Sequence, residues 1–373
     1  MRARVVGLVC AVVCALAWLP FPARAAPEAL PAVDGVLQAF HDHQLVAIGD
    51  NHAMAEEGAF YIALVRDPRF AATVQDVVVE FGGGGHQGVM DRYLNGEAVP
   101  YDELRLIWTD GAGFVPGAMN RMEYGAFFAA VRAVNMGLPP DCRIRVWLGQ
   151  APIDWSTIHS RADQRPLSIG RDRFAADLIE REIVTKGRKA LLIWGQAHFE
   201  DGAVFSPTLG PALKAAHRGS LYYISPYFGF NEAACDAAFE ARAARWPTPA
   251  LIAPLKGSAT LKAMRKPGCT IDPGLAQGPQ GMKPELLSAL RANDDHLAGA
   301  DADALLYLGK EASMTVSPVD PAFYLDDAYF KEMSRRNAIT AGKPIDWADF
   351  VAANPPVVES FDAHIGRRSA APH

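Results

Sequence analysis

Two histidines of this chain lie in the same short pattern, each directly after an apolar segment. Gly49–His52 follows one apolar run and Gly195–His198 follows another, so Gly-x-x-His occurs twice, and a third apolar run ends in Glu80. Imidazole gains or loses a proton near neutral pH, and a carboxylate beside it can fix its tautomer. These residue types indicate the activation of water for hydrolysis. Two histidines and a carboxylate would equally suit a divalent metal ion with open positions.

The position of Glu80 at the end of an apolar segment favours this interpretation. A buried carboxylate is costly unless it has polar partners, and histidine and arginine are suitable ones. Arg171 begins a helical pattern before the second Gly-x-x-His. We therefore predict a catalytic set of His52, Glu80, Arg171 and His198, with His52, Glu80 and His198 as the ligands if a metal ion binds.

The elements that must position these residues are strands alternating with helices. The short β-branched and apolar segments predict strands, which are 45–49, 76–81, 143–148, 190–194, 221–225 and a late one at 304–308. Longer segments of helical periodicity predict helices, among them 55–66, 122–135 and 171–185. This alternation predicts an α/β fold with a largely parallel sheet and helices on both faces. Because ligands bind beyond the carboxyl ends of parallel strands, we expect the two histidines and Glu80 to converge there.

Further polar and aromatic residues are expected at the same rim of the sheet. We predict substrate contacts for five of them, which are Asp50, Asn51, His86, Asp154 and Tyr227. For Asp154 a structural capping role is an equal alternative, and for Tyr227 the alternative is packing in the core.

Two nearby segments have plainer interpretations. The run Gly82–Gly85 lacks the Lys and Ser/Thr of a phosphate-binding loop, so it predicts a flexible loop at the site that brings His86 near. Glu56 and Glu57 are expected to be a solvated helix start.

The first residues predict export. Arg2 and Arg4 precede an apolar run from Val5 to Leu19 and a small-residue site at Ala23–Ala25, which is typical of a secretory signal peptide over residues 1–25. No later stretch has the about 20 apolar residues of a membrane helix. We expect a periplasmic or secreted protein with no transmembrane segment in the mature chain.

The remaining chain is predicted to be one α/β domain over residues 26–360. Residues 266–283 are rich in glycine and proline and predict an irregular insertion, and residues 361–373 predict a disordered tail. Without residues 1–25 the chain has 33 basic and 42 acidic residues, a net charge of −9, which disfavours binding to nucleic acid. In an oxidising compartment Cys235 is expected to pair with Cys269, leaving Cys142 buried before a strand.

The paired Gly-x-x-His motifs, Glu80 at a strand end and the stretch Gly170–Arg173 before a helix resemble the superfamily of erythromycin esterases, ChaN-type haem-binding proteins and the Tiki and TraB families. The resemblance is best over about residues 44–90 and 165–220 and weaker near residues 303–308. It implies an α/β fold with both histidines and the glutamate in one cleft. In the hydrolytic members His52 would act on water, Glu80 and His198 would complete the site, and Arg171 would stabilise negative charge.

The chain also departs from the esterases in ways that leave its activity open. Asp50 follows Gly49 where glutamate is usual, and the spacing is one residue shorter, so macrolide hydrolysis is not implied. One hypothesis is a hydrolase for an ester, amide or related bond of a small molecule or peptide. The alternative is a haem- or iron-binding envelope protein, in which a cleft histidine and the tyrosines at 222, 223 and 227 hold iron. A third is an envelope protein whose inherited site is inactive.

Overall fold

The apolar, β-branched segments of the chain form the strands of one sheet. The structure is a computed structural model, and it describes residues 28–113, 121–199, 208–227, 229, 233–264 and 302–354. Its strands are β1 (Leu30–Pro31), β2 (Leu45–Asp50), β3 (Asp76–Gly83), β4 (Arg145–Gln150), β5 (Ala190–Gly195), β6 (Leu221–Pro226), β7 (Ala250–Ile252) and β8 (Ala304–Tyr307).

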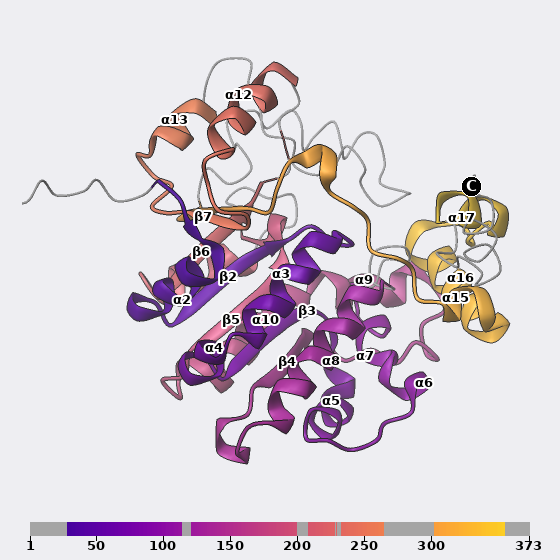
Figure 1. The fold of residues 1–373 in the computed structure, drawn as a ribbon. Coiled ribbons are helices and arrows are strands. Elements are labelled where there is room, and N and C mark those ends of the chain that lie inside the picture. The colour runs from indigo at the N-terminus through magenta and orange to yellow at the C-terminus, as the bar shows by residue number, and fades with distance from the viewer. Residues whose placement is uncertain are drawn as a thin grey trace, which may run out of the picture.

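The strand order in the sheet is β1-β7-β8-β6-β2-β5-β3-β4 (Figure 1). The six strands from β8 to β4 in this order run parallel, whereas β7 pairs antiparallel with both β1 and β8. β2 and β5 are neighbours, and β3 lies beside β5. The three strand ends with predicted site residues are therefore consecutive in the sheet.

Alternating side chains of the central strands enter two different hydrophobic clusters. Val46 and Ile48 belong to one cluster, and Leu45 and Ala47 belong to the other. This is the two-residue alternation of a strand that is buried on both faces.

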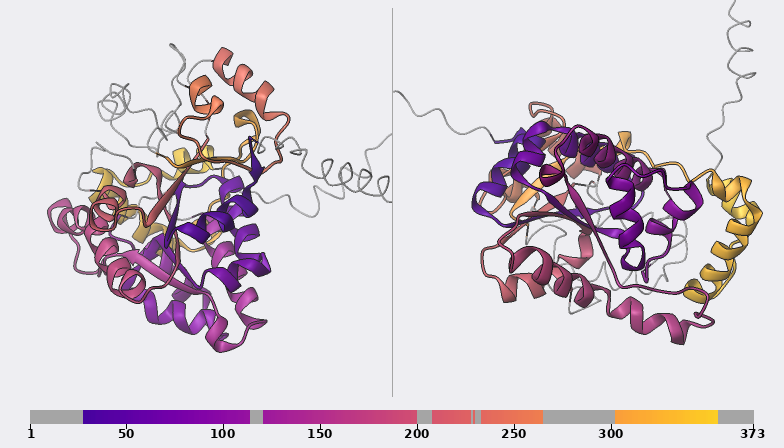
Figure 2. Two further views of the ribbon diagram at one scale, coloured as in Figure 1. Left: turned by 90° about the vertical axis from the view of Figure 1, so that its left-hand side faces the viewer. Right: turned by 90° about the horizontal axis from the view of Figure 1, so that it is seen from below.

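Helices cover both faces of the sheet, as the two turned views in Figure 2 show. The first cluster includes side chains from α2 (Ala32–Asp42), α3 (Ala55–Arg66), α4 (Pro68–Thr73), α5 (Gln87–Leu94) and α8 (Met122–Met136). The second includes side chains from α10 (Arg171–Ile179), α11 (Leu209–Ala216) and α12 (Ala233–Ala243). The predicted fold class, a largely parallel sheet with helices on both faces, is confirmed.

The other helices lie at the ends and edges of the sheet. They are α6 (Tyr101–Leu104), α7 (Leu106–Thr109), α9 (Arg161–Ile169), α13 (Ala259–Met264), α15 (Ala322–Leu325), α16 (Asp327–Ala341) and α17 (Trp347–Ala353). Figure 1 shows α15, α16 and α17 together at one side of the molecule, next to α7 and α9. None of the helices that the structure describes is long and apolar enough to cross a bilayer.

Several details differ from the sequence expectations. The helix predicted over residues 171–185 is α10 followed by a π-helical turn over Glu180–Val184, and β1 and β7 were not predicted. Cys142 is free and exposed rather than buried, because it ends a short 3₁₀ turn before β4 begins. Cys235 is in a disulfide, but Cys269, its predicted partner, lies outside the described residues, as do residues 1–25, 266–283 and 361–373.

Candidate active site

Glu80 is the buried centre of the site. It lies in β3, where the register with β4 shifts between Val79 and Gly83, and its side chain is only 1% exposed. Its Oε2 atom accepts the amide N–H of Gly195 at 2.6 Å. This bond joins the irregular part of β3 to Gly195, the last residue of β5, and fixes the carboxylate.

Both predicted histidines and the predicted arginine surround this carboxylate. His52 Nε2 lies 3.6 Å from Glu80 Oε2, and His198 Nε2 lies 3.6 Å from Glu80 Oε1. Arg171 Nη1 lies 3.4 Å from the same Oε1 atom. The structure therefore brings together the four residues predicted as the catalytic set.

The environment keeps the Glu80 carboxylate ionised. Burial alone would raise its pKa, but the charges of His52 and Arg171, with the Gly195 amide, outweigh burial and lower that pKa below its ordinary value. Glu80 therefore has no proton to donate at neutral pH and acts as a fixed negative charge.

His52 lies in the turn between β2 and α3 and is held from both sides of its ring. Its Nδ1 atom lies 2.6 Å from Asp50 Oδ2, and its Nε2 atom points to Glu80. Burial alone would lower the pKa of His52, but the carboxylates of Glu80 and Asp50 outweigh burial and the Arg171 charge and raise that pKa to about 9. The ring is therefore an imidazolium at neutral pH, with its side chain 24% exposed.

The hydrogen-bond partners of His198 differ from those of His52: a carboxylate lies at one ring nitrogen and a guanidinium at the other. Its Nδ1 atom lies 2.7 Å from Asp172 Oδ2, and its Nε2 atom lies 2.6 Å from Arg171 Nη2. A guanidinium only donates hydrogen bonds, so Nε2 must be the acceptor and the ring proton must be on Nδ1. Arg171 and Asp172 are the first two residues of α10, so the start of one helix contacts both nitrogen atoms of the ring.

Asp172 was missed in the sequence analysis. It is buried, and it also accepts the backbone N–H of Leu209 at 3.0 Å. An acidic residue in the first turn of a helix is common because it complements the helix dipole. Its position after Arg171 therefore gave no separate signal.

Gly195 forms the floor of the site. A Cβ atom added there would lie 2.9 Å from Glu80 Oε2, 3.3 Å from His198 Cδ2 and 3.4 Å from His52 Nε2. Only glycine lets the backbone approach the carboxylate this closely. At Gly49 the close approach is instead to Pro226 and Gln196, so this glycine serves the packing of neighbouring strand ends.

Glu57, Tyr61 and Glu123 form a second group of polar side chains near Asp50. The expectation that Glu57 is solvated is wrong. Glu57 is buried rather than solvated, and its Oε2 atom accepts the Asn51 amide N–H at 2.7 Å. The Tyr61 hydroxyl lies 3.2 Å from Asp50 Oδ1 and 3.5 Å from Glu57 Oε2. Burial and the Asp50 charge raise the pKa of Glu57 well above its ordinary value, and burial raises the pKa of Glu123 to about 7. The burial of Glu57 and the Asp50 charge therefore favour the protonated form of this carboxyl group.

Of the five residues predicted to contact substrate, Asp50 and Asn51 lie beside His52. Asp50 is buried and bonds to the His52 ring, and Asn51 is half-buried in the same turn. Asp50 thus orients His52, which is a different role from the predicted substrate contact.

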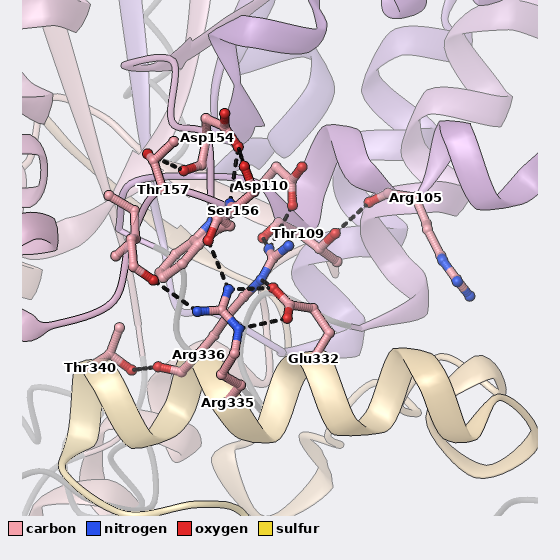
Figure 3. A network of polar contacts seen from close by, with 12 residues as sticks. Arg105, Thr109, Asp110, Asp154, Ser156, Thr157, Glu332, Arg335, Arg336 and Thr340 are labelled. Atoms are coloured by element: carbon pink, nitrogen blue, oxygen red, sulfur yellow. Dashed lines mark hydrogen bonds and ion pairs between the residues drawn. The ribbon is translucent and has the colours of Figure 1, made fainter.

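His86 and Asp154 belong to a separate polar network, part of which Figure 3 shows. His86 Nε2 lies 3.0 Å from Asp110 Oδ2, and Arg336 of α16 donates to Asp110 Oδ1 at 2.6 Å. Asp154 is exposed and accepts from the Ser156 amide at 2.9 Å, which is the capping role given above as its alternative. A groove of about 580 Å³ lies beside this network.

The three tyrosines expected as iron ligands, Tyr222, Tyr223 and Tyr227, pack in or against the hydrophobic clusters of the fold. Tyr227 is 1% exposed, its hydroxyl donates to Asp236 at 2.7 Å, and its ring stacks on Phe239. Tyr223 is fully buried, and the ring of Tyr222 packs against His43, which precedes β2. The contacts described for these tyrosines are those of the core packing alternative.

Comparisons with known proteins give similarity of fold only. No protein-family model and no curated protein sequence matches the chain. A solved structure of a Bacillus cereus protein is 12% identical with a TM-score of 0.49, over 76% of this chain and 91% of that one. ChaN of Campylobacter jejuni, in a structure of cofacial haem binding, is 11% identical with a TM-score of 0.35, over 54% of this chain and 87% of that one. A succinoglycan biosynthesis protein is 11% identical with a TM-score of 0.39, over 55% and 71%.

A ChaN protein is thus among the solved structures to which this chain is similar in fold.

The arrangement does not fit the metal site that was expected as one alternative. A metal ion between His52, Glu80 and His198 would need the Nε2 lone pair of His198, and the Arg171 guanidinium already occupies it at 2.6 Å. The same guanidinium lies 3.4 Å from Glu80, so it supplies the positive charge that an ion would bring. Within the described part of the chain, no group of three or more His, Cys, Asp or Glu side chains is arranged to hold a metal ion.

Proposed function

We propose that this protein is a hydrolase that cleaves an ester, amide or related bond, with His52 as its proton donor. The observation that carries the proposal is the buried Glu80 carboxylate with His52, His198 and Arg171 around it. Burying a carboxylate with this set of partners is costly, and such arrangements cluster at functional sites.

The charges of the site are layered in a way that suits a reacting carbonyl group. The two cations are its more exposed members, His52 at 24% and Arg171 at 17%, whereas the Glu80 carboxylate is 1% exposed. A bound substrate therefore meets positive charge first. Negative charge that develops on a carbonyl oxygen is stabilised by donors fixed in this way.

The proton transfers follow from the protonation states. Water adds to the carbonyl carbon, and Arg171 stabilises the resulting oxyanion. His52 gives its Nε2 proton to the leaving oxygen or nitrogen as the carbon–oxygen or carbon–nitrogen bond breaks. The proton released by the water then restores the imidazolium. The raised pKa of His52 favours this acid role over the water-activating role that the resemblance implied.

The substrate class is a small molecule or peptide with an ester, amide or related bond.

We propose that the protein acts after export, because residues 1–25 have the pattern of a signal peptide. Mass spectrometry of protein recovered from the periplasm or medium should give a mature chain that begins near Ala26. A chain that keeps its first 25 residues would contradict export by cleavage.

The proposal is tested with purified protein and a panel of chromogenic esters and peptide amides. Glu80→Gln removes the central charge with little change of shape, and we expect it to lower turnover by about 10²–10⁴-fold. Glu182→Gln is the matched control, because the bonds that the structure describes for Glu182 are to Arg181 and Lys186 on its own turn. Turnover that survives Glu80→Gln as well as it survives the control would refute the proposed site.

Haem binding is the competing proposal, and it is measured on the same protein. Added haem that gives a Soret band, lost in His52→Ala but not in Glu182→Gln, would favour a haem-binding role over hydrolysis. The structure gives the His52 ring two carboxylate neighbours, which an iron atom would have to displace at Nε2 or Nδ1.

A further inference from the structure

Ala53, which directly follows His52, has a backbone conformation that side chains rarely adopt. Its φ angle is +78°, and it is the one described residue other than glycine with a positive φ. The Cβ atom of an L-residue is crowded in this conformation, so the surrounding structure must hold it there. Such outliers cluster at functional sites.

A segment more than 260 residues further along the chain holds this turn. We call residues 315–317 the crossing segment; they belong to the chain that leads to α15 in Figure 1. The amide N–H of Ser317 donates to the carbonyl of Ala53 at 2.7 Å, and Met54 pairs with Val316 in an antiparallel bridge. The amide N–H of Ala55 donates to the carbonyl of Thr315 at 3.0 Å.

The crossing segment is itself anchored on both sides. The Glu56 carboxylate accepts the amide N–H of Thr315 at 2.9 Å and its hydroxyl at 2.8 Å. On the other side, Arg121 donates to the Ser317 carbonyl at 2.9 Å, and the Ser317 hydroxyl accepts the Glu123 amide N–H at 3.3 Å. The segment therefore ties together the first turns of α3 and α8.

We propose that Thr315, Val316 and Ser317 are positioning residues for His52, because they hold Ala53 in the left-handed conformation that sets where the histidine leaves the turn. The inference deepens the proposed function in that it takes His52 as the reacting imidazole. It makes no use of the substrate. The Asp50 and Glu80 contacts of His52 depend on the course of this turn.

The test compares two substitutions at one position that leave the net charge unchanged. Ser317→Pro removes the amide N–H that Ala53 accepts, and proline suits an extended segment that already continues into Pro318. Ser317→Ala is the matched control, because it removes the same hydroxyl but keeps the N–H. The readout is the pKa of His52 from NMR titration of its ring protons, identified by their absence in His52→Gln.

In Ser317→Pro we expect the Ala53 backbone to relax and His52 to move away from its carboxylates. The pKa of His52 should then fall by at least about one unit, as expected when an opposite charge a few ångströms away is lost. Ser317→Ala should leave it near the parent value. An equal fall in both variants, or a fall in neither, would overturn the proposal.

A rescue experiment separates strain from general damage. Glycine adopts a positive φ at no steric cost, so Ala53→Gly should restore the His52 pKa in the Ser317→Pro background. Damage unrelated to Ala53 would not be rescued, and that result would contradict the proposal.

A measurement on folding covers the case in which Ser317→Pro does not fold. Ala53→Gly alone relieves the strain, so its Tm should not fall, whereas Ala63→Gly, at an exposed helical position of α3, should lower the Tm. Equal losses of Tm in the two variants would show that Ala53 is not strained. Neither this measurement nor the titration needs a substrate, so failure of the proposed hydrolysis and failure of this inference are distinguishable.

Discussion

Arg171 Nη2 lies 2.6 Å from His198 Nε2, and this contact decides the chemistry of the site. It fixes the tautomer of His198 and takes up the lone pair that a metal ion would need. It also holds a permanent positive charge 3.4 Å from Glu80, where it helps to keep the carboxylate ionised. His52 is then the ring left to exchange protons with a ligand.

Replacement of Arg171 by lysine should reduce hydrolysis although the positive charge remains. One ammonium group cannot contact both His198 and Glu80 as the planar guanidinium does. We expect turnover to fall by roughly 10²–10³-fold, the usual effect of losing a donor to an oxyanion. Arg173→Lys is the control, because the Arg173 side chain is 81% exposed on the same helix. An Arg171→Lys protein as active as this control would remove Arg171 from the mechanism.

Asp172→Asn should change the tautomer of His198. The amide that replaces the carboxylate can donate to Nδ1, which would move the ring proton to Nε2, where Arg171 already donates. We expect turnover to fall by roughly 10- to 100-fold, and ¹⁵N chemical shifts of the ring should report the new tautomer. Asp177→Asn, at an exposed position of α10, should change neither quantity. Unchanged ring shifts in Asp172→Asn would contradict the assigned hydrogen bonds.

Gly195→Ala should impair activity more than it impairs folding. The added methyl group would lie 2.9 Å from Glu80 Oε2, in the space that the reacting groups share. We expect turnover to fall by about 10²-fold, the effect of a misplacement of about 1 Å at a reacting centre. Gly88→Ala is the control, since nothing lies within 4 Å of its added Cβ in α5. Full activity in Gly195→Ala would place the reaction elsewhere.

Stability and activity should both depend on the His52 proton. The folded-state pKa of about 9 is above the ordinary 6.5, so the stabilisation is fully present below about pH 6.5 and is lost as the pH rises through about 9. Turnover should fall over the same upper range. Urea unfolding of the parent and of His52→Gln at several pH values gives the difference in their free energies of unfolding. A difference that does not change between pH 6 and 10 would contradict a raised pKa.

The contribution of Glu80 to stability depends on pH in the opposite direction. Its folded-state pKa is lowered below the ordinary 4.5, so its stabilisation is present above about pH 4.5 and is lost as the pH falls through the folded-state pKa. The same unfolding series, carried to low pH with Glu80→Gln, separates the two groups. The parent protein should lose its advantage over Glu80→Gln on the acid side, and it should lose part of that advantage above about pH 9, where His52 gives up the charge that Glu80 stabilises.

The sequence was sufficient to locate the strands that carry the site. The apolar runs before His52, Glu80 and His198 are continuous, because both faces of these strands are buried, and such runs are easily recognised. Strands β1 and β7 have two and three residues, which is too short for any periodicity to show. They were accordingly missed.

The residues that orient the site were harder to predict. Asp50, Asp172 and Glu57 are acidic residues at a strand end and at helix starts, where solvated carboxylates are common. Their roles depend on which elements lie side by side, and α10 reaches His198 only through the packed fold. The contact between Ala53 and Ser317 joins two segments with no pattern in common, so no local signal could reveal it.

The Glu80 carboxylate keeps His52 protonated at neutral pH, and the rest of the mechanism depends on this proton. The most direct test is NMR titration of the His52 ring in the parent protein and in Glu80→Gln. The pKa should be about 9 in the parent and should fall by at least about one unit in the variant. A pKa near the ordinary 6.5 in the parent, or an equal value in both proteins, would contradict the account.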